Sequence, residues 1–410
     1  MPGQAPAHPH PPSLDLLLTL TQLPTASGRE WRVIDFLHAW TAARPDLSIT
    51  PDAAGNLTIA PKQQWGSGGP PILITAHLDH PAFVVERIIA PTILELAFRG
   101  GVLDPYFDHA RITIHPATRD RATGRRGSEP QPVLLATLTQ KTQTGPSGFN
   151  HYLAELDPST PDDLAASIRP GDVATWSLPP AEIDAHGLVH THACDDLAAA
   201  AAALCALDEL RARRAADLPT EDVRLLFTRA EEIGFTGALA ACKLGTIPKN
   251  ARVIALENSR SFPDSPIGSG PIVRVGDRMS IFDPRLTAAC AKRAEDIAAS
   301  PSAPIPWQRK LMAGGACEAT VFCAYGHQAT CLCLPLGNYH NMADLQAVQD
   351  KTYDAAKGPP QIAREFIHKD DYLGLIALLT AIGAKLPENA PISERLESLY
   401  TKHAAILDER

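Results

Sequence analysis

The sequence lacks the features that mark several common protein classes. Its eight cysteines include no Cys-x-x-Cys pair, so neither a zinc knuckle nor a disulfide framework is indicated. No apolar run approaches the roughly 20 residues that span a bilayer. Residues 1–13 carry no basic segment followed by an apolar core, so we expect a short disordered tail there and no secretory signal. These absences favour a cytoplasmic protein of a reducing compartment, with no membrane partner.

Positive charge is also scarce. The 46 acidic residues outnumber the 37 basic ones, and the net charge of -9 gives no support for binding nucleic acid or an anionic membrane. The 410 residues are enough for two domains and a large buried core. We therefore expect a soluble globular protein.

Helical periodicity and short apolar runs alternate over two parts of the chain, residues 14–89 and 188–388. "PPILITAH" is typical of a fully buried strand, and the alanine-rich segment after "HACDD" is strongly helix-prone. Ser27 and Glu30 are spaced as a capping box, and Asp283 and Pro284 as the N-cap and first residue of a helix. This order predicts an α/β catalytic domain, a helix-flanked and mostly parallel sheet, followed by a C-terminal helix over residues 389–410.

Residues 90–187 have a different sequence pattern. Short strand-like segments such as "ARITIHP" and "GDVATWSLP" are divided by proline, glycine and charged loops, with little helical periodicity. We interpret this region as a small β-barrel-like domain inserted into the larger fold.

Acidic residues and histidines recur where the predicted strands end. Ligand sites in open α/β sheets collect at the carboxyl ends of strands, so these side chains are expected to share one cleft, where their repulsion requires a cation. They are His77 and Asp79, Asp195 and Asp196, Glu231 and Glu232, Glu257, and His340.

These residue types suit zinc or a similar divalent ion. Two ions that share a bridging carboxylate can lie roughly 3.5–4 Å apart and lower the pKa of a bound water towards about 7, while a nearby carboxylate takes its proton. Each motif alone has a simpler interpretation. "EE" is usually a solvated face, "DD" before a helix an N-cap, His340 a hydrogen-bonded loop residue, and Glu257 a partner for Arg260 or Arg229. The recurrence at successive strand ends favours the metal site.

Four segments together resemble a known family. "TAHLDHPAF", "HACDDLAAA", "TRAEEIGFTGA" and "LPLGNYHN" are similar to the motifs of the co-catalytic dizinc aminopeptidases of the glutamyl-aminopeptidase and tetrahedral-aminopeptidase family. The similarity runs from "TASGRE" to about Met342. It implies a zinc-exopeptidase-like fold, a peptide substrate, a cis peptide at Asp195–Asp196, and a homo-oligomer built through the β insertion.

The same resemblance implies roles for individual residues. It implies two divalent ions, zinc with cobalt or manganese as alternatives, and Asp195 as the ligand that bridges them. Glu231 would be the general base, and Asp79 would hold the His77 ring in place. The implied metal ligands are His77, Asp195, Glu232, Glu257 and His340.

The sequence departs from the family pattern at three places. Glu257 stands where the family usually has Asp, His80 and Pro81 replace an acidic residue, and Glu318 stands where relatives tend to have Asp. Glu318 either helps to position substrate or surrounding ligands, or is a surface carboxylate. The favoured function is an aminopeptidase acting on short peptides. A carboxypeptidase or amide deacylase with the same metals, and a catalytically silent relative, are the alternatives.

Overall fold

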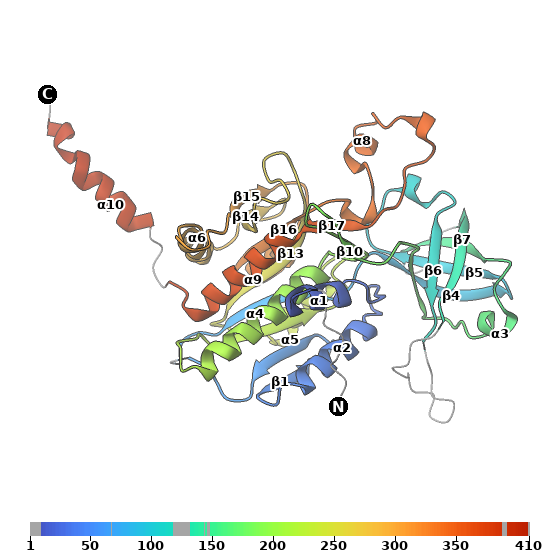
Figure 1. Ribbon diagram of the computed structural model, residues 1–410, viewed down its shortest axis with the longest axis horizontal. Helices are drawn as coiled ribbons and strands as arrows, with labels where there is room; N and C mark the ends of the chain where they lie inside the picture. Colours follow the sequence, from blue (N-terminus) through green and yellow to red (C-terminus); the bar gives the residue numbers. More distant parts are fainter. Residues whose placement is uncertain are drawn as a thin grey trace, which may run out of the picture.

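The structure is a computed structural model that describes residues 10–66, 68–117, 132–142, 144–145, 148–387 and 392–408. Its larger part is built on an eight-stranded sheet with helices on both faces (Figure 1). In order across the sheet, the strands are β1 (Leu47–Pro51), β2 (Leu57–Pro61), β12 (Val223–Thr228), β3 (Ile72–His77), β13 (Arg252–Arg260), β16 (Gln328–Leu336), β14 (Ile272–Asp277) and β15 (Gln308–Met312).

The centre of this sheet is parallel. Strands β12, β3, β13 and β16 run in one direction, whereas β2 joins β12 and β14 joins β16 in the antiparallel sense. At the edges, β1 is antiparallel to β2 and β15 is parallel to β14. The predicted α/β fold with a mostly parallel sheet is confirmed, and the carboxyl ends of its central strands share one edge.

Alternate residues of the central strands pack on opposite faces. On β3, Ile72 and Ile74 belong to the larger core, whereas Leu73 belongs to a second core. The larger core includes α1 (Pro12–Leu20), α2 (Trp31–Ala42), α4 (Leu197–Ala215), α6 (Pro284–Ala298) and α9 (Lys369–Ala384), and the second includes α5 (Thr236–Leu244) and α7 (Glu318–Ala324).

Helix α4 is buried on all sides over its first half. The alanines from Ala198 to Ala203 are all buried, and α1 and α9 pack against the helix. Small side chains on every face allow this close packing, as expected for an interior helix. The helix begins at Leu197, directly after the Asp195–Asp196 pair, so its packing holds this pair against the sheet domain.

The two predicted helix starts have different outcomes. Asp283 caps α6 by accepting a hydrogen bond from the backbone N–H of Leu286, with Pro284 next, as predicted. The capping box at Ser27 and Glu30 is wrong. Glu30 is itself the N-cap residue of α2, and its side chain makes no cap because its carboxylate accepts a hydrogen bond from the N–H of Ala230. The Ser27 hydroxyl donates to the carboxylate of Asp79 instead.

A closed six-stranded barrel is inserted between β3 and the rest of the sheet domain. Its core is aromatic: Phe83, Phe98, Phe107 and Trp176 pack mostly edge to face or tilted. In order around the barrel, the strands are β4 (Ala82–Ala90), β5 (Ile93–Arg99), β8 (Asn150–Leu156), β7 (Leu134–Lys141), β6 (Arg111–His115) and β9 (Val173–Trp176). The first strand thus starts before residue 90, because it follows the end of β3 almost directly.

The remaining elements are short or lie near the ends of the chain. A three-stranded sheet consists of β10 (Glu182–Ile183), β11 (Leu188–Thr191) and β17 (Glu365–His368). The short helices are η1 (Asp104–Phe107), α3 (Asp162–Ala165), η2 (Tyr339–Asn341), α8 (Leu345–Gln349) and η3 (Ala355–Lys357), and the chain ends in α10 (Ile392–His403) and η4 (Ala404–Asp408). Residues 1–9 of the expected tail, and most of the charged loop "ATRDRATGRRGSEP", lie outside the described residues.

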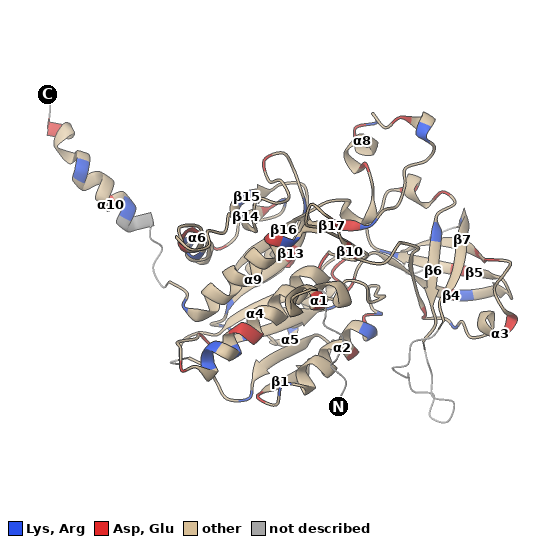
Figure 2. Cartoon of the chain, viewed as in Figure 1, with Lys and Arg blue, Asp and Glu red and all other residues tan. Residues whose placement is uncertain are grey.

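Charged residues of both signs are interspersed over the elements (Figure 2). Among the described residues, no helix combines the length and apolar character needed to cross a membrane.

Candidate metal centre

The predicted site residues come from separate parts of the chain and meet at the edge where the parallel strands end. His77 is the last residue of β3, and Glu231 and Glu232 follow β12 in the turn before α5. Asp195 precedes α4, and His340 lies in η2, just after β16. Asp195 is joined to Asp196 by a cis peptide, as the resemblance implied.

Glu257 also lies at this edge, but not at a strand end. Strand β13 leaves β3 after Ala255 and continues beside β16 as far as Arg260. The prediction that Glu257 ends its strand is therefore wrong, because β16 goes on supplying backbone partners beyond it. The parting of β3 and β13 opens the space into which the site is built.

Asp195 lies between the two histidines. Its Oδ1 is 3.3 Å from Nε2 of His77, and its Oδ2 is 3.6 Å from Nε2 of His340. The same His340 nitrogen is 3.3 Å from Oε1 of Glu232. His77, Asp195 and Glu232 each offer a ligand atom, and these atoms lie within 4.8 Å of one another. A carboxylate with one oxygen towards each imidazole is suited to bridge two cations.

The facing atoms of this cluster lack hydrogen-bond partners in the described part of the chain. They are buried, and buried polar atoms are normally hydrogen-bonded, so they require another partner. Imidazole nitrogen and carboxylate oxygen are donors that zinc takes when no thiolate is offered. The residues present therefore fit a divalent metal ion. The unpaired atoms are Nε2 of His77, Oδ1 of Asp195, Oε1 of Glu232 and Nε2 of His340.

The charges of the cluster also call for a cation. Burial alone would lower the pKa of both histidines, but the surrounding carboxylates raise the pKa of His77 and of His340 well above the ordinary value. The carboxylates thus attract positive charge strongly enough to overcome burial. A divalent ion can supply that charge in place of protons.

Both imidazoles are held so that Nε2 faces the cluster. Nδ1 of His77 lies 3.1 Å from the main-chain oxygen of Asp79, and Nδ1 of His340 lies 2.6 Å from the main-chain oxygen of Gly101. A carbonyl oxygen only accepts, so each Nδ1 carries the proton and each Nε2 keeps its lone pair for a metal. Gly101 belongs to the segment after β5, so the inserted barrel region helps to orient a candidate ligand.

Asp79 connects the end of β3 to the Glu231–Glu232 turn. Its carboxylate accepts hydrogen bonds from the N–H of Glu231 at 2.9 Å, from the N–H of Glu232 at 3.1 Å and from the Ser27 hydroxyl at 2.6 Å. Its Oδ1 is also 3.5 Å from Nδ1 of His77. Asp79 therefore fixes the positions of three predicted site residues relative to one another.

Glu231 and Glu257 border the cluster. Oε2 of Glu231 is 4.0 Å from Nε2 of His77. Burial raises the pKa of Glu231 well above the ordinary value, with Glu232 and Asp79 adding to the effect and His77 opposing it. Burial, Asp195 and Glu231 raise the pKa of Glu257 in the same way. A carboxylate whose affinity for protons is raised is suited to accept one during a reaction.

Glu365 was not anticipated from the sequence, although it contacts two predicted ligands. This buried residue of β17 accepts hydrogen bonds from the N–H of Cys194 at 2.7 Å and of Asp195 at 3.1 Å with one oxygen, and from the N–H of His340 at 2.8 Å with the other. Burial raises its pKa to about 7. One carboxylate thus fixes the backbone of the candidate bridging ligand and of the candidate terminal histidine.

His80, one of the departures from the family pattern, lies behind Asp195. Its Nδ1 is 2.6 Å from the main-chain oxygen of Asp195, and its Nε2 is 3.0 Å from Oδ1 of Asn341. The Asn341 amide nitrogen donates to the main-chain oxygen of His192, which sets the orientation of that amide. His80 therefore links the segment before α4 to η2.

Glu318 is buried at the start of α7, with only 1% of its surface exposed. The surface-carboxylate alternative is therefore wrong. Burial raises its pKa to about 7, and His77 opposes this shift. The carboxylate oxygens of Asp196 make no hydrogen bond to the described residues. The Glu318 carboxylate interacts with Thr228, and both carboxyl groups feel the charge of His77, so both lie close to the cluster.

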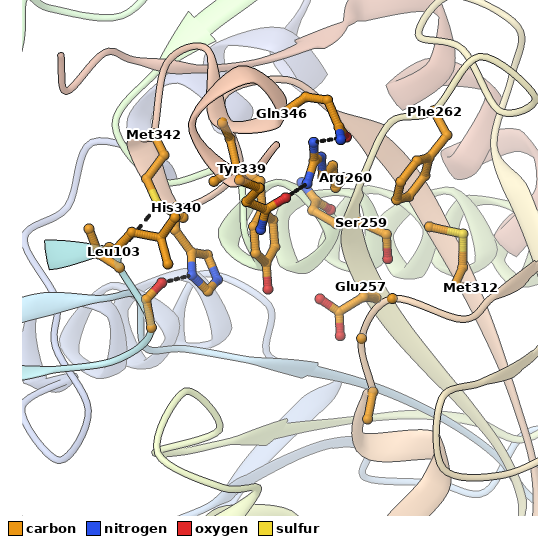
Figure 3. Close-up of a pocket in the computed structure, with 18 of the residues that line it drawn as sticks. Leu103, Glu257, Ser259, Arg260, Phe262, Met312, Tyr339, His340, Met342 and Gln346 are labelled. Carbon is orange, nitrogen blue, oxygen red and sulfur yellow. Dashed lines mark hydrogen bonds between the residues drawn. The ribbon is translucent and has the colours of Figure 1, made fainter. Parts of the chain in front are cut away.

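A cavity of about 630 Å³ opens beside the cluster. Glu257, Tyr339 and His340 form part of its wall, and in Figure 3 the Tyr339 ring is seen between the side chains of His340 and Glu257. Phe262 and Met312 contribute apolar surface. Polar and apolar side chains both line it, and a pocket of this size is typical of small-molecule or peptide sites.

Comparison with known proteins is consistent with this geometry. The sequence model of the M42 glutamyl aminopeptidase family matches residues 55–353. The match includes every predicted metal ligand but not Glu365.

Solved structures of archaeal peptidases share the fold. An aminopeptidase from Desulfurococcus kamchatkensis is 21% identical, with a TM-score of 0.67, over 92% of this chain and 95% of that chain. The TET1 peptidase of Pyrococcus horikoshii, described as assembling into a tetrahedron or a large octahedral shell, is 19% identical, with a TM-score of 0.66, over 91% and 100%. A TET aminopeptidase from a marine-sediment thaumarchaeon is 18% identical, with a TM-score of 0.68, over 92% and 98%.

Proposed function

The chain belongs to the M42 glutamyl aminopeptidase family, and from this premise we propose that it removes N-terminal residues from short peptides by means of two divalent metal ions. Family membership supports a metal-dependent aminopeptidase over the carboxypeptidase and deacylase interpretations. The complete set of candidate ligands argues against a catalytically silent relative. The number and identity of the metal ions, the roles of individual residues and the substrate belong to the proposal.

The observation that carries the proposal is the convergence of unpaired ligand atoms around Asp195. Nε2 of His77 and Nε2 of His340 face opposite oxygens of one carboxylate, with Glu232 beside His340. We assign His77, Asp195, Glu232, Glu257 and His340 as the ligands, with Asp195 shared. Zinc suits this donor set, and cobalt or manganese are alternatives.

Bound divalent ions would supply the acidification of a water molecule and the polarisation of the substrate carbonyl. Glu231 would accept the proton of the attacking water and return it to the leaving amine, because its carboxylate borders the cluster and burial raises its affinity for protons. Asp79 would keep this base in place, since it accepts the backbone N–H of Glu231, and it would keep His77 oriented.

The free amine of the substrate would lie near Glu257, which forms the cavity wall next to His340. Among the described residues that line the cavity, Glu257 is the only Asp or Glu, so it is the anionic group that a cationic amine would meet there. Its extra methylene relative to Asp changes its reach but leaves a carboxylate ligand.

The proposal also covers the oligomeric state of the protein and the compartment in which it works. We infer a homo-oligomer formed through the inserted barrel, supported by the assemblies described for P. horikoshii TET1, which shares the fold. The eight cysteines are all free thiols, which supports a reducing, cytoplasmic compartment.

The test is a single peptide in three forms: free, N-acetylated and C-amidated. The proposal expects the free and C-amidated forms to be cleaved at the first peptide bond and acetylation to remove most turnover. Cleavage of the acetylated peptide at the rate of the free one, together with a block by amidation, would overturn it.

A further inference from the structure

Tyr339 lines the cavity beside the candidate metal centre, but the reaction proposed above does not use it. It is the first residue of η2 and directly precedes the candidate ligand His340. Tyr339 is partly exposed, and in Figure 3 its ring is seen between the side chains of His340 and Glu257. The phenol therefore belongs to the wall that a substrate at the metal centre would meet.

The Tyr339 ring is held by the imidazole of His340. The two rings are stacked, with their centroids 3.8 Å apart and their planes at 22°. Side chains of consecutive residues do not face each other in a regular helix, but His340 has a φ of 55°, which breaks the turn and allows the stack. Because the imidazole is fixed by the main-chain oxygen of Gly101, the phenol has a fixed place beside the metal centre.

The Tyr339 hydroxyl makes no hydrogen bond to the described residues. The hydroxyls of Tyr106, Tyr353 and Tyr372, in contrast, each donate to a main-chain oxygen. Polar groups inside a protein are normally hydrogen-bonded, so a hydroxyl left free in a cavity wall indicates a partner that enters the cavity.

The hydroxyl also lies within electrostatic reach of the cluster. Burial raises the pKa of Tyr339 well above the ordinary value, and four carboxylates of the site add to the shift: Asp195, Glu232, Glu257 and Glu231. A tyrosine with its ordinary pKa of about 10 already keeps its proton at neutral pH, so the phenol is a donor with or without this shift. Once divalent ions neutralise these carboxylates, the O–H is free to donate to a substrate oxygen.

Peptide hydrolysis creates negative charge where such a donor can act. When water attacks the carbonyl carbon, an electron pair of the carbon–oxygen double bond moves to the oxygen, which becomes negative. A fixed donor aimed at that oxygen stabilises the transition state more than it stabilises the substrate.

We propose that the Tyr339 hydroxyl donates a hydrogen bond to the oxygen of the scissile carbonyl as that oxygen becomes negative, which makes Tyr339 a catalytic residue. The inference rests on the proposed function, since it concerns the same reaction. The phenol keeps its hydrogen throughout, and the electron pair returns to the carbon–oxygen bond when the amine leaves. Glu231 as base and Tyr339 as donor therefore have separate tasks.

Tyr339→Phe tests the hydroxyl alone, because phenylalanine keeps the ring that stacks on His340. We expect kcat for Ala-Ala-amide to fall by about 10- to 100-fold, the range of one hydrogen bond to a charged group. KM and the affinity for zinc should stay within about threefold of the wild-type values, since the bond forms only in the transition state. Tyr372→Phe is the matched control and should keep the wild-type kcat, because the Tyr372 hydroxyl lies away from the cavity and donates to the main-chain oxygen of Ser13.

Ligand binding gives a readout that does not depend on turnover. In a Glu231→Gln background, calorimetry compares Ala-Ala-amide with its phosphinic analogue, in which a tetrahedral phosphorus with a negative oxygen replaces the scissile carbonyl. Adding Tyr339→Phe should weaken binding of the phosphinic analogue by about 10- to 100-fold and binding of Ala-Ala-amide by less than about threefold. Equal effects on the two compounds would overturn the catalytic role.

Other outcomes also decide the matter. A wild-type kcat in folded Tyr339→Phe overturns the inference. Loss of zinc together with activity in Tyr339→Phe overturns it as well, because Tyr339 would then only support His340. Failure of the wild type to hydrolyse any unblocked peptide would instead refute the proposed function, and with it the reaction that this donor serves.

Discussion

Replacing Glu365 with glutamine should weaken metal binding, although Glu365 is not a proposed ligand. The carboxylate offers acceptors to three backbone N–H groups, those of Cys194, Asp195 and His340. A glutamine amide has only one oxygen, so its NH₂ group must face at least one of these donors. The change thus misplaces either the segment of Asp195 or that of His340.

The size of the effect follows from the bonds that are lost. Hydrogen bonds to a charged group contribute about 1.5–3 kcal/mol, and a buried donor left unpaired costs about 1–3 kcal/mol. We expect Glu365→Gln to lower the free energy of unfolding by about 1–3 kcal/mol. Residues that orient metal ligands typically change metal affinity by about 10- to 100-fold, and we expect a loss of that order.

Competition for zinc with a chromophoric chelator measures the affinity, and urea denaturation measures the stability. Asp371→Asn is the matched control, because Asp371 is also buried and accepts two backbone N–H groups, those of Gly268 and Gly270. It should lose stability but keep its zinc affinity. Equal zinc affinity in Glu365→Gln and the wild type would refute a positioning role for Glu365.

Three further predictions concern the base, the barrel and its surface. Glu231→Gln should retain both metal ions while kcat falls by about 10²–10⁴-fold, whereas Glu232→Gln should lose metal. Elemental analysis and kinetics check this, and the reverse pattern would exchange the roles of base and ligand. Burial, with Arg32 nearby, lowers the pKa of His115 to about 3. The unfolded chain therefore takes up a proton at this histidine at higher pH than the folded chain does, so the free energy of unfolding falls as the pH drops from about 6.5 towards 3. Because His115 is partly exposed, the free energy of unfolding should fall by up to about 2 kcal/mol by about pH 4.5. Urea denaturation at a series of pH values should show that His115→Gln loses less stability than the wild type as the pH falls. Replacing the exposed Ile88 and Ile89 of β4 with lysine should lower the particle mass in light scattering if the barrel mediates assembly, and an unchanged mass would contradict that role.

Much of the site could be predicted because its residues follow apolar runs that are easily recognised as strands or helices. His77 is the last residue of β3, Glu231 and Glu232 follow β12, and Asp195 precedes the alanine-rich α4. Periodicity locates such junctions, and the parallel centre of the sheet brings them to one edge.

The residues that support the site could not be predicted in this way. Glu365 lies in a short strand after the last motif, and nothing near it in the sequence marks a carboxylate that accepts three N–H groups. The Gly101 contribution is a main-chain oxygen, which carries no side-chain signal. Ser27 and Glu30 have the spacing of a local cap, but long-range partners, Asp79 and Ala230, take their side chains instead.

Metal content and activity measured on the same preparation test the central claim most directly. We predict two divalent ions per chain by elemental analysis, no peptide hydrolysis after a chelator has removed them, and recovery of hydrolysis on adding zinc, cobalt or manganese. Full hydrolysis by the metal-free protein, or full activity with a single ion per chain, would contradict the account.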